Sequence, residues 1–118
     1  MKPGDVIEKP WGCEEILDLC GAYCVKRLNV YPGRRLSLQR HERKRETMML
    51  LQGAAVLIRG DETAQTPAPM AIGEACVIEP GVVHRVEGSP DRGAVIIEVS
   101  TPELDDVVRL EDDYGRSA

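Results

Sequence analysis

The sequence predicts an all-β protein that folds as a small sandwich or barrel, and three observations indicate this. Turn signals recur about every 8–12 residues, which is typical of such folds. Helical periodicity is weak along the whole chain. The chain has 118 residues, of which 42% are hydrophobic and 30% charged, as in an ordinary soluble domain. We therefore expect one domain over residues 1–118.

Apolar segments bounded by turn residues define the expected strands. Pro32-Gly33 and Pro80-Gly81 are turn pairs in which glycine can adopt a positive φ, and Gly53 ends another segment. In chain order, the expected strands cover residues 15–19, 23–31, 35–41, 46–51, 54–58, 75–78, 83–86, 94–100 and 107–110.

The segment 35–41 shows the clearest alternation of apolar and polar residues. As a strand it would place Leu36 and Leu38 on one face, and Gln39 and His41 on the other. The face with the two leucines would meet water unless a neighbour or the N-terminal segment covers it. We therefore expect a homodimer.

Two other segments are ambiguous. Residues 41–49 contain good helix formers, but an apolar run leads from Met48 into a glycine turn, so a loop followed by a strand is favoured. Residues 63–69 contain two prolines and little pattern, which predicts a loop or a weak edge strand.

Charge and hydropathy exclude several classes of protein. The net charge of −5 argues against a nucleic-acid-binding protein, and no apolar run approaches the roughly 20 residues that span a membrane. The N-terminus shows no signal peptide, so we expect a cytoplasmic protein. Basic residues nevertheless gather between residues 23 and 45, where Glu42 is the only acid. This cluster is either a solvated face or a local positive field for a small anion.

The four cysteines are expected to be free thiols. None belongs to a CxxC pair, so a zinc knuckle is not expected. Cys20 and Cys24 would lie diagonally across a turn, which is poor geometry for a disulfide. Cys76 lies in an apolar run and is expected in the core.

The two histidines suggest a metal site. His41 shares a strand face with Gln39, Glu46 follows a short polar loop, and His84 follows the Pro80-Gly81 turn. Two imidazoles, one carboxylate and one amide oxygen could enclose a divalent cation. The alternative is that His41 is a surface residue and His84 an ordinary strand histidine.

Several motifs together resemble a known family. Residues 32–53 and 80–85 resemble the two motifs of the cupin superfamily, and residues 26–41 resemble the cupin domain of type II mannose-6-phosphate isomerases. That domain is also the C-terminal part of bifunctional isomerase/mannose-1-phosphate guanylyltransferases. Pro10-Trp11-Gly12 and residues 105–116 match the motifs that flank it.

This resemblance implies a fold, a metal and a reaction. The fold would be a double-stranded β-helix, a jelly-roll barrel with its site inside. The family interconverts mannose 6-phosphate and fructose 6-phosphate with a divalent metal, often zinc. By position, the metal ligands would be Gln39, His41, Glu46 and His84. Nitrogen and oxygen ligands suit several divalent ions, so zinc is an expectation from the resemblance alone.

Candidate residues for the substrate lie inside family-like motifs. Lys26 and Arg109 are expected to bind the phosphate of a small anionic sugar, with Arg85 as a further cation at the catalytic centre. Glu98 interrupts an apolar strand and is the candidate for proton transfer, since a buried carboxylate without a role or partner would be unusual. The alternatives are ordinary surface charge for the cations and an ion pair for Glu98.

The sequence also departs from the family. After His41 the family usually continues with two histidines, Arg, Ala, Glu, His and Trp, whereas in residues 42–48 only Glu46 is retained. Arg43 replaces the second histidine of the usual pair and cannot bind a metal, which argues against sites that need three histidines. A non-catalytic metal-binding or sugar-binding cupin, or a cupin enzyme for another small polar substrate, therefore stays open. No nucleotidyltransferase reaction is expected from these 118 residues.

Overall fold

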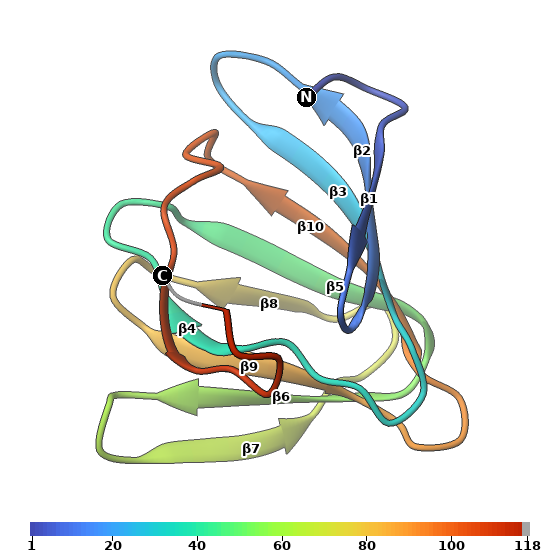
Figure 1. Cartoon of the computed structure of the whole chain (residues 1–118), viewed down its shortest axis with the longest axis vertical. Coiled ribbons are helices and arrows are strands. Elements are labelled where there is room, and N and C mark those ends of the chain that lie inside the picture. Colours follow the sequence, from blue (N-terminus) through green and yellow to red (C-terminus); the bar gives the residue numbers. More distant parts are fainter. Residues whose placement is uncertain (117–118) are drawn as a thin grey trace.

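The protein is a β-barrel made of two facing antiparallel sheets, seen in a computed structural model that describes residues 1–116 (Figure 1). The first sheet has the strand order β1-β2-β3-β10-β5-β8 and the second the order β11-β4-β9-β6-β7. The strands are β1 (Val6–Lys9), β2 (Gly12–Leu19), β3 (Cys24–Val30), β4 (Leu38–Arg40), β5 (Glu46–Gly53), β6 (Ala55–Gly60), β7 (Gln65–Pro69), β8 (Ala75–Ile78), β9 (Val83–Gly88), β10 (Ala94–Ser100) and β11 (Val108–Glu111).

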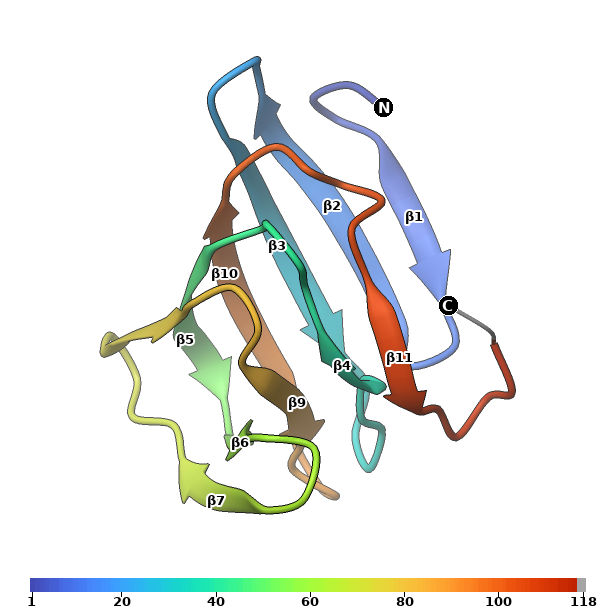
Figure 2. The same ribbon diagram turned by 90° about the vertical axis from the view of Figure 1, so that its left-hand side faces the viewer.

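Strands that are distant in the sequence lie side by side in both sheets. β10 pairs with β3 on one side and with β5 on the other, and β4 lies between β11 and β9. Figure 2 shows the last strand, β11, in front of the first sheet, where it lies at the edge of the second sheet beside β4. The first and last strands therefore form edge strands of different sheets, β1 in the first sheet and β11 in the second.

The inward faces of the strands change from apolar to polar along the barrel. On β10 the buried side chains run from Ile96 to Glu98, and on β5 from Leu50 to Glu46. β9 repeats the change with Val86 and His84. Because alternate residues of a strand face the same side, each strand contributes to both regions. One half of the interior is a hydrophobic core and the other half is a polar site.

Most of the predicted strands are present. The ranges 75–78 and 94–100 match β8 and β10, and the weak edge strand expected within 63–69 is β7 at the edge of its sheet. Residues 41–45 form a loop before β5, as expected, and not a helix. The turn glycines Gly33, Gly53 and Gly81 have φ values of 73°, 80° and 85°.

Two expectations about strands are wrong. β1 was not expected, and its contact with β2 adds a strand to the edge of the first sheet. The segment 35–41 is regular only over β4, and Leu36 and Leu38 are both buried instead of facing outward. Residues 36–38 are all buried, so the expected alternation of buried and exposed side chains is absent. The expectation of a dimer therefore cannot rest on Leu36 and Leu38.

The cysteines and the hydropathy agree with the sequence. All four cysteines are free, and Cys76 is buried in the core. Across residues 1–116, no helix has the length and apolar character needed to cross a membrane.

Candidate metal centre

A polar cavity of about 100 Å³ lies inside the barrel between the two sheets. Both sheets and both terminal segments line it, and basic side chains outnumber acidic ones. Gly12 lets the N-terminal hairpin pack closely, since a Cβ atom there would lie 1.8 Å from the carbonyl oxygen of Asn29. The charged and polar lining includes Lys9, Glu14, Lys26, Gln39, His41, Lys44, Glu46, His84, Glu98, Arg109 and Arg116.

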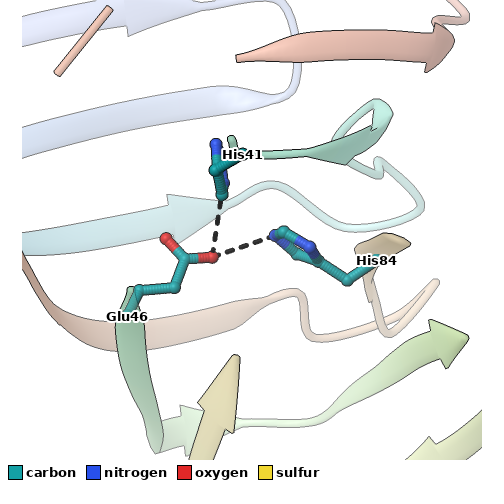
Figure 3. Close-up of side chains that lie close together, drawn as sticks. All are labelled: His41, Glu46 and His84. Atoms are coloured by element: carbon teal, nitrogen blue, oxygen red, sulfur yellow. Dashed lines mark ion pairs between the residues drawn. The ribbon is translucent and has the colours of Figure 1, made fainter. Parts of the chain in front are cut away.

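His41, Glu46 and His84 converge in this cavity (Figure 3). His41 follows β4, Glu46 begins β5 and His84 lies in β9, so three separate segments supply the cluster. The Oε1 atom of Glu46 is 2.9 Å from Nε2 of His84 and 3.7 Å from Nε2 of His41. One ligand atom from each residue lies within 4.8 Å of the others, and all three residues are buried.

The second ring nitrogen of each histidine faces a backbone carbonyl. Nδ1 of His41 contacts the carbonyl oxygen of Asp106, and Nδ1 of His84 is 3.0 Å from that of Val82. A carbonyl only accepts hydrogen bonds, so each Nδ1 donates to its carbonyl and each Nε2 is the ring nitrogen directed at Glu46. Carbonyl partners of this kind orient metal-binding histidines. The two imidazoles are therefore held ready to bind a cation.

The arrangement at Glu46 fits a metal ion. Its Oε1 atom is buried and has no hydrogen-bond partner among residues 1–116. Burial alone would raise the pKa of Glu46, but the imidazoles of His41 and His84 and the charge of Lys44 outweigh it and hold that pKa well below its usual range. Two imidazole nitrogens and a carboxylate oxygen thus converge on one another, which is a set of ligand atoms that a divalent cation can bind. Tetrahedral ligand atoms that each bind zinc at about 2.0–2.1 Å lie roughly 3 to 3.5 Å from one another. The distances from Oε1 of Glu46 to the two Nε2 atoms, 2.9 and 3.7 Å, are close to this range.

Gln39 lies next to this cluster. In the pairing of β4 with β9, it stands directly opposite His84, and its side chain lines the same cavity. Its Nε2 atom is 3.5 Å from the carbonyl oxygen of Ser37, to which it donates. The amide oxygen is then the atom that could complete a set of four ligands.

Asp106 fixes the loop that carries His41. Its carboxylate accepts the backbone N–H groups of Glu42, Arg43 and Lys44 at 2.9, 2.7 and 2.9 Å. The bond from Glu42, helped by the other two, lowers the pKa of Asp106 to about 2 against the opposing effect of its desolvation. Asp106 belongs to the C-terminal motif noted in the sequence. That motif therefore stabilises the loop that begins at His41, without itself supplying a residue to the cluster.

Glu98 and Lys44 are buried beside the cluster. Lys44 places its Nζ atom 3.4 Å from Oε1 of Glu98 and 3.4 Å from Oε2 of Glu46. Burial, reinforced by the charge of Glu46, raises the pKa of Glu98 to about 7, although Lys44 and Lys26 act in the opposite direction. The two carboxylates outweigh the effect of burial on Lys44 and raise its pKa. Glu98 is thus both inside the cavity and in an ion pair.

Cations cluster in another part of the cavity lining. Nζ of Lys26 is 3.2 Å from Oε1 of Glu14, and Nζ of Lys9 is 3.9 Å from the same oxygen. Arg109 lines the cavity from the other sheet and stands opposite Gln39 in the β11–β4 pairing. One carboxylate between two lysines leaves a local excess of positive charge on this side.

Arg85 lies apart from the other predicted residues. It follows His84 in β9, so its side chain points to the opposite face of the strand and does not line the cavity. Its Nε donates to the carbonyl oxygen of Leu36, and its Nη1 lies 3.5 Å from Glu111. The structure therefore separates Arg85 from the centre at which it was expected.

Several cavity residues were not predicted from the sequence. Lys9 belongs to a strand that was not expected, and Glu14 precedes the expected strand 15–19. Lys44 stands between two exposed arginines in a charged run, and nothing in that run marks it as buried. Arg116 could have been found, since it ends the C-terminal motif.

Solved structures share this fold. The capsular polysaccharide assembling protein CapF from Staphylococcus aureus superposes with a TM-score of 0.77 over 92% of this chain and 34% of its own, at 19% identity. KdgF from Halomonas sp. gives a TM-score of 0.70 over 86% of this chain and 90% of its own, at 18% identity. These likenesses concern the fold alone, which is the all-β cupin barrel, a double-stranded β-helix.

Sequence relatives identify the family. XanB of Xanthomonas campestris pv. campestris is 34% identical over 114 residues, which are 94% of this chain and 24% of that protein. The mannose-1-phosphate guanylyltransferase ManC of Salmonella typhimurium is 36% identical and covers 93% of this chain and 23% of its own length. The chain thus spans about a quarter of the length of these relatives. The model of the family described as mannose-6-phosphate isomerase C-terminal matches residues 3–112, and the chain belongs to that family.

Proposed function

We propose that this cupin domain is a metal-dependent sugar-phosphate isomerase that interconverts mannose 6-phosphate and fructose 6-phosphate. The observation that carries the proposal is the convergence of His41, Glu46 and His84 in a cavity that also holds a buried carboxylate and an excess of cations. Membership of the mannose-6-phosphate isomerase C-terminal family supports the choice of reaction. We also propose zinc as the metal, the cytoplasm as the location and a homodimer as the assembly.

In this proposal the metal is held by His41, Glu46 and His84, with Gln39 as the fourth ligand. A bound divalent ion supplies Lewis-acid polarisation of the sugar oxygens at C1 and C2. Isomerisation removes a proton from C2 of the open-chain aldose and adds one to C1, while another proton moves between the two oxygens. Glu98 is the group assigned to the carbon-bound proton, because it lies buried in the same cavity.

Lys26 and Arg109 are the residues proposed to hold the phosphate, and Lys9 joins them. The two lysines share Glu14, and Arg109 lies across the cavity, so an anionic group between them would gain from both sheets. A phosphate held there would fix the distance between the anchored end of the sugar and the metal. Such positioning accelerates a reaction by keeping the reacting atoms in place.

Two variants test the proposal, because one should lose metal binding and the other should lose affinity for the substrate. His41→Ala removes a metal ligand, so we expect lower metal content by elemental analysis and a lower kcat. Arg109→Ala should keep the metal and raise KM roughly tenfold with a smaller effect on kcat, if it contributes about 1.4 kcal/mol of uniform binding. A coupled assay for fructose 6-phosphate measures both constants. Unchanged metal content and kinetics in both variants would reject the assignment.

A second candidate is a sugar-binding cupin without catalysis. The altered run beside the centre favours it, because Arg43, Thr47 and Met48 replace residues usual in the family. The same cavity would then bind sugar phosphates without converting them. Calorimetric binding of mannose 6-phosphate to metal-loaded protein that shows no turnover would support this candidate, and a screen of other sugar phosphates would detect a different substrate.

A further inference from the structure

The ammonium group of Lys44 lies between two buried carboxylates. Its Nζ atom is 3.4 Å from Oε2 of Glu46 and 3.4 Å from Oε1 of Glu98. Lys44, Glu46 and Glu98 are 7%, 2% and 5% exposed, so water screens none of the three charges well. The flanking Arg43 and Arg45 are exposed, so the backbone turns Lys44 alone inward.

The backbone brings the two carboxylates close together. In the pairing of β10 with β5, Ser100 stands opposite Glu46 and Glu98 opposite Met48. Glu46 and Glu98 are therefore diagonal neighbours on the inner face of one sheet, within reach of each other. Two buried carboxylates at this spacing repel, and both could bind one cation. A further contact is therefore needed to determine which of the two carboxylates faces the metal.

The contacts of Lys44 with both carboxylates determine which carboxylate oxygen faces the metal centre. Glu46 turns Oε1 to the two histidines and Oε2 to Lys44, so only one of its oxygens faces the metal centre. Glu98 directs Oε1 to the same ammonium. A lysine has three N–H donors and no lone pair when charged, so it can bind both carboxylates but cannot join the metal ligands.

We propose that Lys44 is a positioning residue that keeps the two buried carboxylates in separate roles. It limits Glu46 to one metal-binding oxygen and holds Glu98 away from the metal, which leaves Glu98 available for the substrate. The last part rests on the proposed isomerisation, whereas the metal-binding part rests only on a cation bound by His41, Glu46 and His84. The positive charge of Lys44 also lowers the affinity for a divalent cation.

Removing the ammonium tests this proposal through metal binding. In Lys44→Met, repulsion between Lys44 and the ion is lost and Glu98 is free to become an additional ligand. We expect zinc to bind at least tenfold more tightly than in the wild type, measured by competition with a chromophoric chelator. Cobalt(II) should show weaker visible absorption bands, because an extra carboxylate raises its coordination number. Lys44→Arg keeps the charge and should retain the affinity and spectrum of the wild type.

The double variant Lys44→Met/Glu98→Gln identifies the source of the effect. If Glu98 supplies the extra ligand, the double variant should lose most of the gain in affinity and recover the cobalt spectrum of the wild type. Glu98→Gln alone should change the affinity little. These comparisons form a double-mutant cycle. The non-additive part of the change in zinc-binding free energy measures the coupling between Lys44 and Glu98.

Several outcomes would overturn the proposal. Zinc affinity and a cobalt spectrum that do not change in a folded Lys44→Met protein would show that Lys44 only supports the fold. Tighter binding that persists in the double variant would exclude Glu98 as the added ligand. If Lys44→Met fails to fold by circular dichroism, Lys44→Gln replaces it with the same expectations. Failure of the isomerase assay in every variant would reject the proposed function while these metal measurements still decide the role of Lys44.

Discussion

At the scale of single residues, the chemistry depends on which atoms are already engaged by the protein. The Nδ1 atoms of His41 and His84 face carbonyl oxygens, so their Nε2 atoms are the ring nitrogens directed at Glu46. The sequence could identify these residues because few residue types bind metals. In addition, Glu46 follows a short polar loop and His84 follows the Pro80-Gly81 turn. It could not identify Lys44, because the depth of a lysine in a charged loop depends on contacts made elsewhere in the chain.

Glu98 gives the sharpest prediction at this scale. Replacing it with glutamine removes the carboxylate but keeps the shape, so a protein that uses it for proton transfer should lose about 100- to 10,000-fold in kcat. The metal content should stay that of the wild type, because Glu98 is held by Lys44 and not by the metal cluster. Steady-state kinetics and elemental analysis on the same preparation measure both quantities. A kcat within twofold of the wild type would remove Glu98 from the mechanism.

At the scale of strands and loops, alternation predicted most of the barrel. β8 and β10 have the expected bounds because both are short apolar runs that end at clear turn or polar signals. The expected strand 35–41 was too long, since residues 36–38 are buried together and regular pairing is confined to β4. β1 was missed because its four residues are two apolar residues followed by two charged ones, without the alternation that marks a strand, and the strand is formed by pairing with β2.

The loop at residues 41–45 is stabilised by Asp106, and this gives a prediction with a defined pH dependence. Folding lowers the pKa of Asp106 to about 2, from an unfolded value of about 3.9. The stabilisation is therefore fully present above the unfolded value and is lost as the pH falls toward 2. Asp106→Asn should unfold at a lower temperature than the wild type at pH 7.

Thermal unfolding of the metal-free proteins measures this effect without interference from the ion. The gap in Tm between the wild type and Asp106→Asn should narrow as the pH is lowered from about 4 to about 2. Asp105→Asn is a matched control, because the neighbouring side chain of Asp105 is exposed and the N–H groups of this loop donate to Asp106 instead. A gap that stays constant with pH would contradict the account of the Asp106 contacts.

At the scale of the whole molecule, the barrel separates an apolar half from a polar half. The outer face of the first sheet adds a third feature, since Leu51, Val77 and Val99 on neighbouring strands are 43%, 39% and 42% exposed. A second copy could cover the same patch through a twofold axis. The homodimer therefore stays a prediction, although buried Leu36 and Leu38 cannot be its reason.

Light scattering at tens of micromolar tests the assembly. We expect the mass of a dimer for the wild type and a shift toward the monomer for Val99→Glu, because a charge would then be buried in the contact. Val6→Glu is the control, since Val6 is exposed on β1 at the opposite edge of the sheet from β8. A monomeric wild type would contradict the prediction directly.

The measurement that tests the central claim most directly compares metal-loaded with metal-free protein. The wild type is stripped with a chelator, reloaded with zinc, and assayed for conversion of mannose 6-phosphate into fructose 6-phosphate. The convergence of His41, Glu46 and His84 beside Glu98 predicts turnover in the reloaded protein and none in the stripped protein. Equal rates in the two samples, or no turnover of either sugar phosphate in the reloaded one, would contradict it.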